Sequence, residues 1–178
     1  ASIARKMDAD HLNLYSPPTG HLEHRRLLAR WLENVGVTIE PSNLALTSNA
    51  RQAISLAFDL ACGPRGTILT ERISYPGAIA LARRKGHCLI GIDIDAQGMV
   101  PQALSRALER VSCGHTAVYL TPTLHNPTTA TMSAERRQAI VEICRQANVW
   151  IIEDGVYALG HSATPALATL APERVFHV

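Results

Sequence analysis

The sequence predicts an α/β domain with a mostly parallel sheet and flanking helices. Short apolar segments rich in β-branched residues alternate along the chain with amphipathic stretches of ten or more residues, which is the order typical of a parallel sheet. The 178 residues are 47% hydrophobic and 18% charged, a composition that suits one compact domain with a sizeable core. Only 4% of the residues are aromatic, so the core is expected to be mainly aliphatic.

The first third of the chain predicts two helices. After the loop YSPPTG at 15–20, residues 21–36 carry an apolar stripe on one helical face, and Gly36 is expected to end this helix. The segment LALTS at 44–48 predicts a short strand that leads straight into a second helix, which ends just before Gly63. The first stripe consists of Leu28, Trp31, Leu32 and Val35, and the second of Ala50, Ile54, Ala57 and Ala61.

The rest of the chain alternates regularly between strands and helices. Ser133 is a suitable N-cap for the last long helix, which has Glu135 in its first turn and is expected to reach about Asn148. In parallel sheets ligands bind beyond the carboxyl ends of the strands, so a site is expected in the loops that follow them. The expected strands are 67–71, 88–94, 117–121, 149–153 and 174–178, and the other helices are 76–86 and 101–111.

Composition and charge exclude several functions. The formal net charge is +2, and the basic residues are scattered over the expected helices, so no nucleic-acid-binding surface is predicted. No apolar stretch approaches the about 20 residues needed to cross a bilayer, so no membrane partner is expected. The first ten residues have no apolar signal-peptide core and no starting methionine, as expected of a cut through a longer chain or a trimmed terminus.

Cysteine and histidine spacing gives no metal site. The cysteines are single and dispersed, which is typical of a reducing cytoplasm, and they are expected to be small buried apolar residues. No C-x-x-C pair exists, and the neighbours His21 and His24 have no third ligand near them in sequence. The cysteines are Cys62, Cys88, Cys113 and Cys144.

Three common site motifs are absent, and two loops at the expected sheet edge remain of interest. There is no G-x-G-x-x-G, no G-x-x-x-x-G-K-[ST] and no G-x-S-x-G. At TSNARQAI (47–54) a strand runs into a helix, so free N–H groups of the first turn could bind a phosphate, although most such turns bind nothing. Tyr75 in ISYPGA could stack on a planar ligand or simply cover the sheet end.

Two later loops add polar side chains at the same edge. Asn126 precedes Pro127, so its backbone is extended and its amide is presented rather than used as a helix cap. His125 beside it is interpreted as a structural hydrogen-bonding residue rather than a catalyst. Asp154 follows a buried strand, with Tyr157 three positions later, and its carboxylate either bonds a neighbouring loop or holds a cationic ring nitrogen.

Together these groups match what pyridoxal phosphate requires. The phosphate is an anion, the ring is flat, and its phenolic oxygen accepts hydrogen bonds. The ring nitrogen must stay protonated to draw electrons from the substrate carbon. A nearby carboxylate raises the pKa of that nitrogen by stabilising its charged form. The combination therefore predicts a pyridoxal-phosphate site more strongly than any one loop does.

On these motifs the sequence resembles, over nearly its whole length, the fold-type I aminotransferase-like superfamily, which uses pyridoxal 5'-phosphate. HNPT at 125–128 resembles the Asn-Pro motif of that family, which implies that Asn126 contacts the ring hydroxyl. EDGVY resembles its D-x-x-Y motif, which implies that Asp154 holds the ring nitrogen and Tyr157 contacts the ring oxygen. Tyr75 falls at the ring-stacking position. The implied architecture is the large domain of this fold.

The same resemblance implies the phosphate contacts and a dimer. TSNARQAI is similar to the turn T-x-G-A-x-x-A-L, which implies backbone contacts from Ala50 and Arg51, although Asn49 stands where glycine is usual. YSPPTG resembles Y-x-P-x-x-G, whose tyrosine reaches the phosphate of the neighbouring subunit, so Tyr15 is expected to act across a homodimer. A cis Asn126–Pro127 bond, common in this family, is also expected.

Within the superfamily, residues 69–83 and 122–160 look most like the MocR-type regulators of the GntR group. These bacterial proteins join an amino-terminal winged-helix DNA-binding module to an aminotransferase-like effector domain. Thr129 stands where ordinary aminotransferases have glycine, and Arg136 and Arg137 are a family marker expected on a solvated helix face. The resemblance implies a domain that senses an amino-acid-like compound by aldimine exchange and acts on DNA through a module outside this chain.

The family's Schiff-base lysine has no match in this sequence. Lys6 lies in the amino-terminal segment and Lys85 at a solvated helix end, so the lysine is expected beyond Val178 and this chain alone is expected to be non-catalytic. Residues 1–20 are expected to form an arm that contributes to the dimer, and 21–178 a partial large cofactor-binding domain.

Two alternatives to a regulator remain open. One is the large domain of a free-standing class I/II aminotransferase, which transfers an amino group between an amino acid and a 2-keto acid. The other is an α/β domain whose cofactor site is vestigial.

Overall fold

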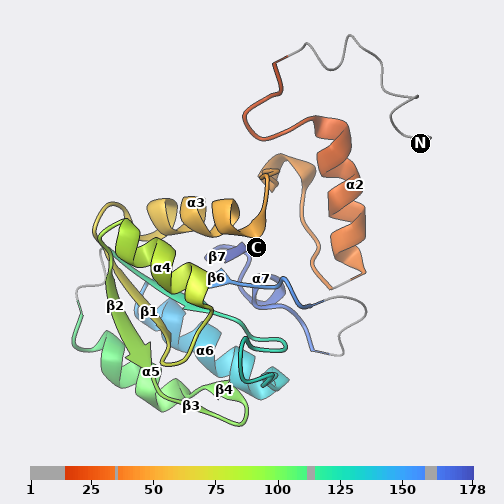
Figure 1. The fold of residues 1–178 in the computed structure, drawn as a ribbon. Coiled ribbons are helices and arrows are strands. Elements are labelled where there is room, and N and C mark those ends of the chain that lie inside the picture. Colours follow the sequence, from red (N-terminus) through yellow and green to blue (C-terminus); the bar gives the residue numbers. More distant parts are fainter. Residues whose placement is uncertain (1–14, 35, 112–114, 159–163) are drawn as a thin grey trace.

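A five-stranded, fully parallel sheet lies at the centre of the fold. Its strands run in the order β2-β1-β5-β6-β7 (Figure 1). The sheet and its order confirm the predicted α/β class. The strands are β1 (Thr67–Glu71), β2 (Cys88–Ile92), β5 (Thr116–Leu120), β6 (Trp150–Glu153) and β7 (Val175–His177). The computed structural model describes residues 15–34, 36–111, 115–158 and 164–178.

Helices cover both faces of the sheet. α3 and α4 pack on one face and α5, α6 and α7 on the other, while α2 stands to one side (Figure 1). A small cluster of Leu32, Val37 and Ala166 connects α2 to the rest of the domain. The helices are α2 (Leu22–Glu33), α3 (Ala50–Cys62), α4 (Pro76–Arg84), α5 (Pro101–Leu108), α6 (Ala134–Gln146) and α7 (Leu167–Leu170), with a 3-10 turn η1 (Pro41–Asn43).

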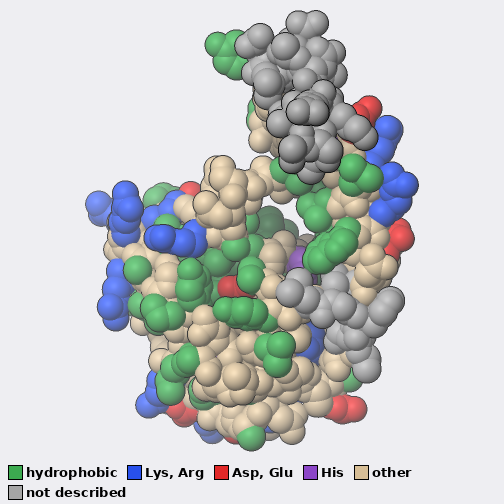
Figure 2. All heavy atoms as spheres, turned by 45° about the vertical axis from the view of Figure 1, so that its right-hand side comes forward, with side chains coloured by type: hydrophobic (Ala, Val, Ile, Leu, Met, Phe, Trp, Pro, Cys, Tyr) green, Lys and Arg blue, Asp and Glu red, His purple; other side chains and the backbone are tan. Residues whose placement is uncertain are grey.

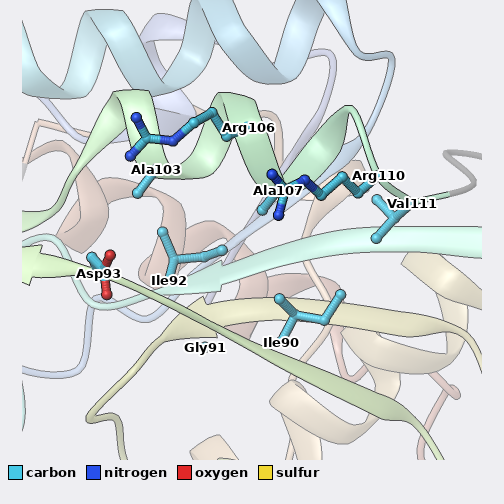
Figure 3. A pocket seen from close by; sticks show the side chains of 9 residues that line it. All are labelled: Ile90, Gly91, Ile92, Asp93, Ala103, Arg106, Ala107, Arg110 and Val111. Atoms are coloured by element: carbon cyan, nitrogen blue, oxygen red, sulfur yellow. The ribbon is translucent and has the colours of Figure 1, made fainter.

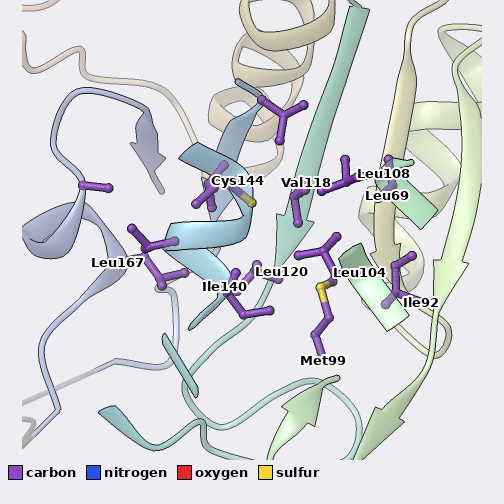
Figure 4. Close-up of a cluster of buried hydrophobic side chains, with 14 of the residues drawn as sticks. Leu69, Ile92, Met99, Leu104, Leu108, Val118, Leu120, Ile140, Cys144 and Leu167 are labelled. Atoms are coloured by element: carbon purple, nitrogen blue, oxygen red, sulfur yellow. The ribbon is translucent and has the colours of Figure 1, made fainter. Parts of the chain in front are cut away.

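The side chains of β5 show how the two halves of the core are built. Val118 and Leu120 enter the cluster shared with α5 and α6, and Figure 4 shows them facing Leu104 and Ile140. The alternate residues of the strand, Tyr119 among them, enter the cluster shared with α3 and α4. Because both faces are buried, the strand reads in sequence as a continuous apolar run.

The predicted caps and stripe of two long helices are confirmed. The Ser133 hydroxyl oxygen accepts a hydrogen bond from the Arg136 N–H at the start of α6. Gly63 ends α3 with a φ of 61°, a conformation that favours glycine. Three of the four residues of the predicted stripe on α3, Ile54, Ala57 and Ala61, are buried in the core, whereas Ala50 is half-buried.

The predicted strand at 44–48 is wrong, and that at 88–94 is too long. The Leu46 N–H donates to the Thr19 carbonyl at 3.0 Å, so the backbone of 44–48 pairs with the 15–20 loop instead of the sheet. β2 ends at Ile92, and the following residues turn into a hairpin between β3 (Ile94–Asp95) and β4 (Gly98–Met99).

The expected burial of single residues is confirmed in part. Cys62 and Cys144 are buried, but Cys88 is exposed because it begins the strand at the sheet edge. Trp31, predicted on the apolar stripe of the first helix, is 47% exposed, whereas Leu32 is buried. Val35 and Cys113 lie outside the described residues.

The described residues contain neither a membrane-spanning helix nor a metal-binding cluster. None of the helices there has the length and apolar character that a membrane span requires. The same residues contain no group of three or more His, Cys, Asp and Glu side chains placed to hold a metal ion. In Figure 2 hydrophobic side chains gather over one broad face, and lysine and arginine side chains lie mainly toward its borders.

Candidate functional site

A pocket of about 130 Å³ lies where the amino ends of α3 and α4 meet the carboxyl ends of β5 and β6. Eight residues line it, and five of them are among the seven predicted site residues, although they come from four separate segments. The sequence did not indicate the other three lining residues, Ile54, Thr121 and Val156, of which two are apolar. The lining residues are Ala50, Ile54, Tyr75, Thr121, Asn126, Asp154, Val156 and Tyr157.

Asp154 contributes a buried carboxylate to this pocket. It directly follows β6 and is 6% exposed. Its Oδ2 accepts a hydrogen bond from the Tyr119 hydroxyl at 2.6 Å, and its Oδ1 accepts one from the Val156 N–H at 3.3 Å. A buried carboxylate with two donors is held in one orientation, so the site has a fixed acceptor at its wall.

The first turn of α3 brings backbone N–H groups to the pocket. The Gln52 N–H is taken by the Asn49 side-chain oxygen at 3.0 Å, and the Gln52 side chain accepts from the Ser48 N–H at 2.8 Å. The N–H groups of Ala50 and Arg51, the first two of the helix, have no partner within it. Asn49 therefore caps the helix and leaves two donors for an anion.

Tyr75 forms a wall of the pocket with its ring held close to α4. It precedes the first residue of that helix, and its side chain is half-buried. A Cβ atom at Gly77 would lie only 2.3 Å from Cζ of the Tyr75 ring. Glycine at this position is therefore required for the observed placement of the ring.

The loop that carries Asn126 is closed by its own hydrogen bonds. The Asn126–Pro127 peptide is cis, as expected. His125 is 1% exposed and its Nδ1 lies 2.7 Å from the Thr128 hydroxyl, which agrees with a structural hydrogen-bonding role. Thr129 has a φ of 61°, which is rare for a β-branched residue and usual for the glycine found there in ordinary aminotransferases.

A second buried carboxylate contacts the backbone of Thr121, which lines the pocket. Glu71 ends β1, is 1% exposed, and accepts from the Thr121 N–H at 3.3 and 3.4 Å. His125 Nε2 lies 3.4 Å from Glu71 Oε2. Burial raises the pKa of Glu71, and the neighbouring His125 only partly offsets that rise. In the sequence, Glu71 is the last residue of the expected strand 67–71, and no role was predicted for it.

Arg137 is buried, which overturns its predicted place on a solvated helix face. It is 1% exposed, whereas the side chain of its neighbour Arg136 is 15% exposed and pairs with Asp95 at 2.8 Å. α6 turns residue 137 toward the sheet with its other buried residues. The Arg137 guanidinium donates to the carbonyls of Met132, Pro122 and Pro165 and to the Thr123 hydroxyl, at 2.8 to 3.2 Å.

The buried carboxylate of Glu153, the residue before Asp154, has three hydrogen-bonding partners. It is 2% exposed and accepts from the N–H groups of Leu167 and Ala168 at 2.9 Å each. Its Oε2 also lies 3.0 Å from His177 Nδ1. Burial raises the pKa of Glu153, but His177 and the two backbone donors outweigh burial, so the net pKa is below the ordinary value.

This shift predicts a stabilising effect that acid removes. A carboxyl whose pKa is lower in the folded state stabilises the fold above its unfolded pKa of about 4.5 and loses that effect as pH falls below it. We expect Glu153→Gln to lower the free energy of unfolding by about 2 kcal/mol at pH 7. The difference from wild type should shrink as urea unfolding is repeated from pH 4.5 down to 3. Glu142→Gln, on the exposed face of α6, is the control, and an equal, pH-independent loss in both variants would contradict the assignment.

The side chains of the remaining candidates do not line the pocket. The Arg51 side chain is exposed on α3, so its predicted contact is left to its backbone N–H beside Ala50, and Tyr15 is fully exposed at the start of the described chain. Lys85, expected to be solvated, is half-buried at the end of α4, and its Nζ lies 2.5 Å from Asp59 Oδ2. Lys6 lies outside the described residues.

A larger hollow, of about 320 Å³, lies between β2 and α5 at the sheet edge. Figure 3 shows Ile90 and Ile92 on its strand side and Arg106 and Arg110 on the helix. None of the predicted site residues lines it. We assign the site to the smaller pocket because the buried carboxylate, the aromatic ring and the free helix N–H groups meet there.

Three comparisons relate the chain to known proteins. Residues 2–178 match the family model described as aminotransferase class I and II. The aminotransferase swnA of Metarhizium robertsii is 32% identical, over 80% of this chain and 30% of that protein. The uncharacterized HTH-type transcriptional regulator YdfD of Bacillus subtilis is 31% identical, over 80% of this chain and 29% of that protein. The chain thus spans about 30% of the length of these relatives.

A solved structure agrees with these matches. It is LysN, an α-aminoadipate aminotransferase from Thermus thermophilus, complexed with N-(5'-phosphopyridoxyl)-L-leucine. It superposes on this chain with a TM-score of 0.77 and 25% sequence identity, over 92% of this chain and 42% of that one. The structure and the relatives therefore agree on one fold, shared by enzymes and regulators.

Proposed function

The chain belongs to the aminotransferase class I and II family, and from this premise we propose that it is the pyridoxal-phosphate-binding part of a MocR-type regulator's effector domain. The family as a whole depends on pyridoxal phosphate. The observation that carries the proposal is the meeting of Asp154, Asn126, Tyr75 and Tyr157 at one pocket with the amino end of α3.

The groups at the pocket fit this cofactor one by one. The N–H groups of Ala50 and Arg51 suit its phosphate, since helix amino ends favour anions. The Tyr75 ring suits its flat face. Asp154 suits a protonated ring nitrogen, and Asn126 and Tyr157 suit the ring oxygen.

Bound pyridoxal phosphate supplies an electron sink for an amino compound. The residues of this chain would bind and orient that group: Asp154 would hold the proton on the ring nitrogen, and Tyr75 would pack against the flat face of the ring. Lys85 is paired with Asp59 away from the pocket, and Lys6, outside the described residues, does not match the family's lysine in sequence. We therefore place the Schiff-base lysine outside this chain and assign the chain binding rather than catalysis.

The relatives support a wider setting, which is part of the proposal. Several HTH-type regulators match over most of this chain, among them TauR of Rhodobacter capsulatus at 31% identity over 85% of it. We infer that the intact protein is cytoplasmic, senses an amino-acid-like effector and contacts DNA through a module outside the chain. A homodimer would let the exposed Tyr15 reach the partner's phosphate site. A free-standing aminotransferase is the second candidate, because swnA matches equally well.

Reduction with borohydride tests the proposal directly. The intact protein, loaded with pyridoxal phosphate and reduced, is expected to carry one labelled lysine, which peptide mapping should place outside residues 1–178. DNA binding that changes when amino compounds are added would support the regulator, and turnover of amino acid plus keto acid the enzyme. No specific adduct would refute cofactor binding, and an adduct at Lys85 would refute the assignment of the lysine.

A further inference from the structure

Tyr119 lies near the carboxyl end of β5, two residues before Thr121, which lines the pocket. It is 1% exposed, and its ring meets that of Phe58 edge to face with centroids 5.7 Å apart. Its hydroxyl donates to Asp154 Oδ2 at 2.6 Å. The side chain therefore joins the interior of the sheet to the carboxylate at the pocket wall.

The hydroxyl of Tyr119 acts only as a donor in this contact. Burial, followed by the negative charge of Asp154, raises the pKa of Tyr119 far above its ordinary value. The phenol consequently keeps its proton at physiological pH. Because a carboxylate only accepts hydrogen bonds, the direction of this one is fixed.

The two buried carboxylates, Asp154 in the pocket wall and Glu71 behind Thr121, have separate partners. Glu71 accepts from the Thr121 N–H and faces His125, whereas Asp154 accepts from Tyr119 and from the Val156 N–H. A carboxylate offers about four acceptor positions, so Asp154 keeps about two for a donor in the pocket. One contact to each of its oxygens also holds the group against rotation.

Resting on the proposed function, we propose that Tyr119 is a positioning residue that holds the Asp154 carboxylate ready for the N–H of a pyridinium ring. A carboxylate fixed before binding loses no rotamer freedom when the ring arrives, and this preorganisation strengthens binding. Tyr119 touches no ligand in this arrangement, since it does not line the pocket, and its effect passes through Asp154.

The test is Tyr119→Phe in the intact protein, read by cofactor titration and by ¹⁵N NMR of bound ring-labelled pyridoxal phosphate. The variant keeps the ring against Phe58 and removes only the hydroxyl, so folding is expected, and a melting curve checks it. We expect the Kd for pyridoxal phosphate to rise about tenfold, the usual effect of losing one hydrogen bond to a charged group. The nitrogen resonance should shift toward the unprotonated position.

Thr70→Val is the matched control. Thr70 lies opposite Tyr119 in the neighbouring strand and is buried, and its hydroxyl donates to Ser74 rather than to the pocket. The Thr70→Val variant should have a lower melting temperature but an unchanged ¹⁵N resonance of the bound cofactor. A Tyr119→Phe protein that behaves the same way, with a Kd within twofold of wild type, would make the hydroxyl a core contact and overturn the inference.

A double variant separates this inference from the proposed function. If Tyr119 acts through Asp154, adding Tyr119→Phe to Asp154→Ala should raise the Kd no further. Full additivity would overturn the positioning role and leave the cofactor site intact. Wild-type protein that binds no pyridoxal phosphate would instead refute the proposed function, and the inference with it.

Discussion

Replacing Arg137 with methionine is expected to cost about 3 to 5 kcal/mol of the free energy of unfolding, the range found when a buried ionic partner is removed. The side chain length is kept, but three carbonyls and the Thr123 hydroxyl lose their donor. Glu153 also loses the cation 4.0 Å from its carboxylate. Urea unfolding of the intact protein at pH 7 measures the effect.

The neighbouring arginine provides the control. Arg136→Met removes one bond to the Met99 carbonyl and an ion pair whose Asp95 carboxylate is exposed, so we expect a loss of about 1 kcal/mol. Arg137→Lys should recover little, because a single ammonium cannot reproduce the planar fork that reaches four acceptors. Equal losses of stability in the Arg136→Met and Arg137→Met variants would contradict the role of Arg137 as a buried donor to four acceptors.

The buried hydrogen bonds of Arg137 also connect the stability of the fold to the candidate site. Arg137 holds Pro122 and Thr123 at one end of the Asn126 loop and Met132 at the other. A loop fixed at both ends presents its amide in one place, whereas a released loop must be ordered when a ligand binds. Loss of Arg137 should therefore weaken binding at the pocket even at temperatures where the protein stays folded.

The order of strands and helices could be read from the sequence because the inner strands β1, β5 and β6 are buried and apolar along nearly their whole length and the long helices keep an apolar stripe. The prediction for 44–48 was wrong because the residues suit a strand, but their backbone bonds the 15–20 loop. That pairing depends on tertiary structure, which the local sequence does not show. Arg137 failed for a similar reason. An arginine on a helix reads as solvated, and only the packing of α6 brings carbonyls around it.

The site was predictable to the extent that its groups follow strands. Asp154 and Asn126 come after strand ends, and parallel strands bring such ends together, which explains how five predicted residues share one pocket. Tyr119 and Ile54 lie inside regular elements, where an apolar or aromatic residue reads as core. Nothing in a single sequence separates a core tyrosine from one whose hydroxyl reaches a site.

Asp154→Ala is the variant expected to change function most. It removes the acceptor proposed for the ring nitrogen, and charge-assisted hydrogen bonds contribute about 1.5 to 3 kcal/mol, so the Kd for pyridoxal phosphate should rise about 10- to 150-fold. Protonation of the ring nitrogen should be lost, which the absorbance of the bound cofactor and its ¹⁵N resonance would show. Unchanged affinity and spectra would remove the main support for the proposed function.

A second substitution separates charge from shape. Asp154→Ala also leaves the buried Tyr119 hydroxyl without its acceptor, which alone costs about 1 to 3 kcal/mol of stability. Asp154→Asn keeps an oxygen for Tyr119 and nearly the same volume but has no negative charge. If the carboxylate acts through its charge, the asparagine variant should keep most of the stability and still lose the protonated ring nitrogen. If it recovers both, Asp154 is a shape-filling residue and its charge is not what the site requires.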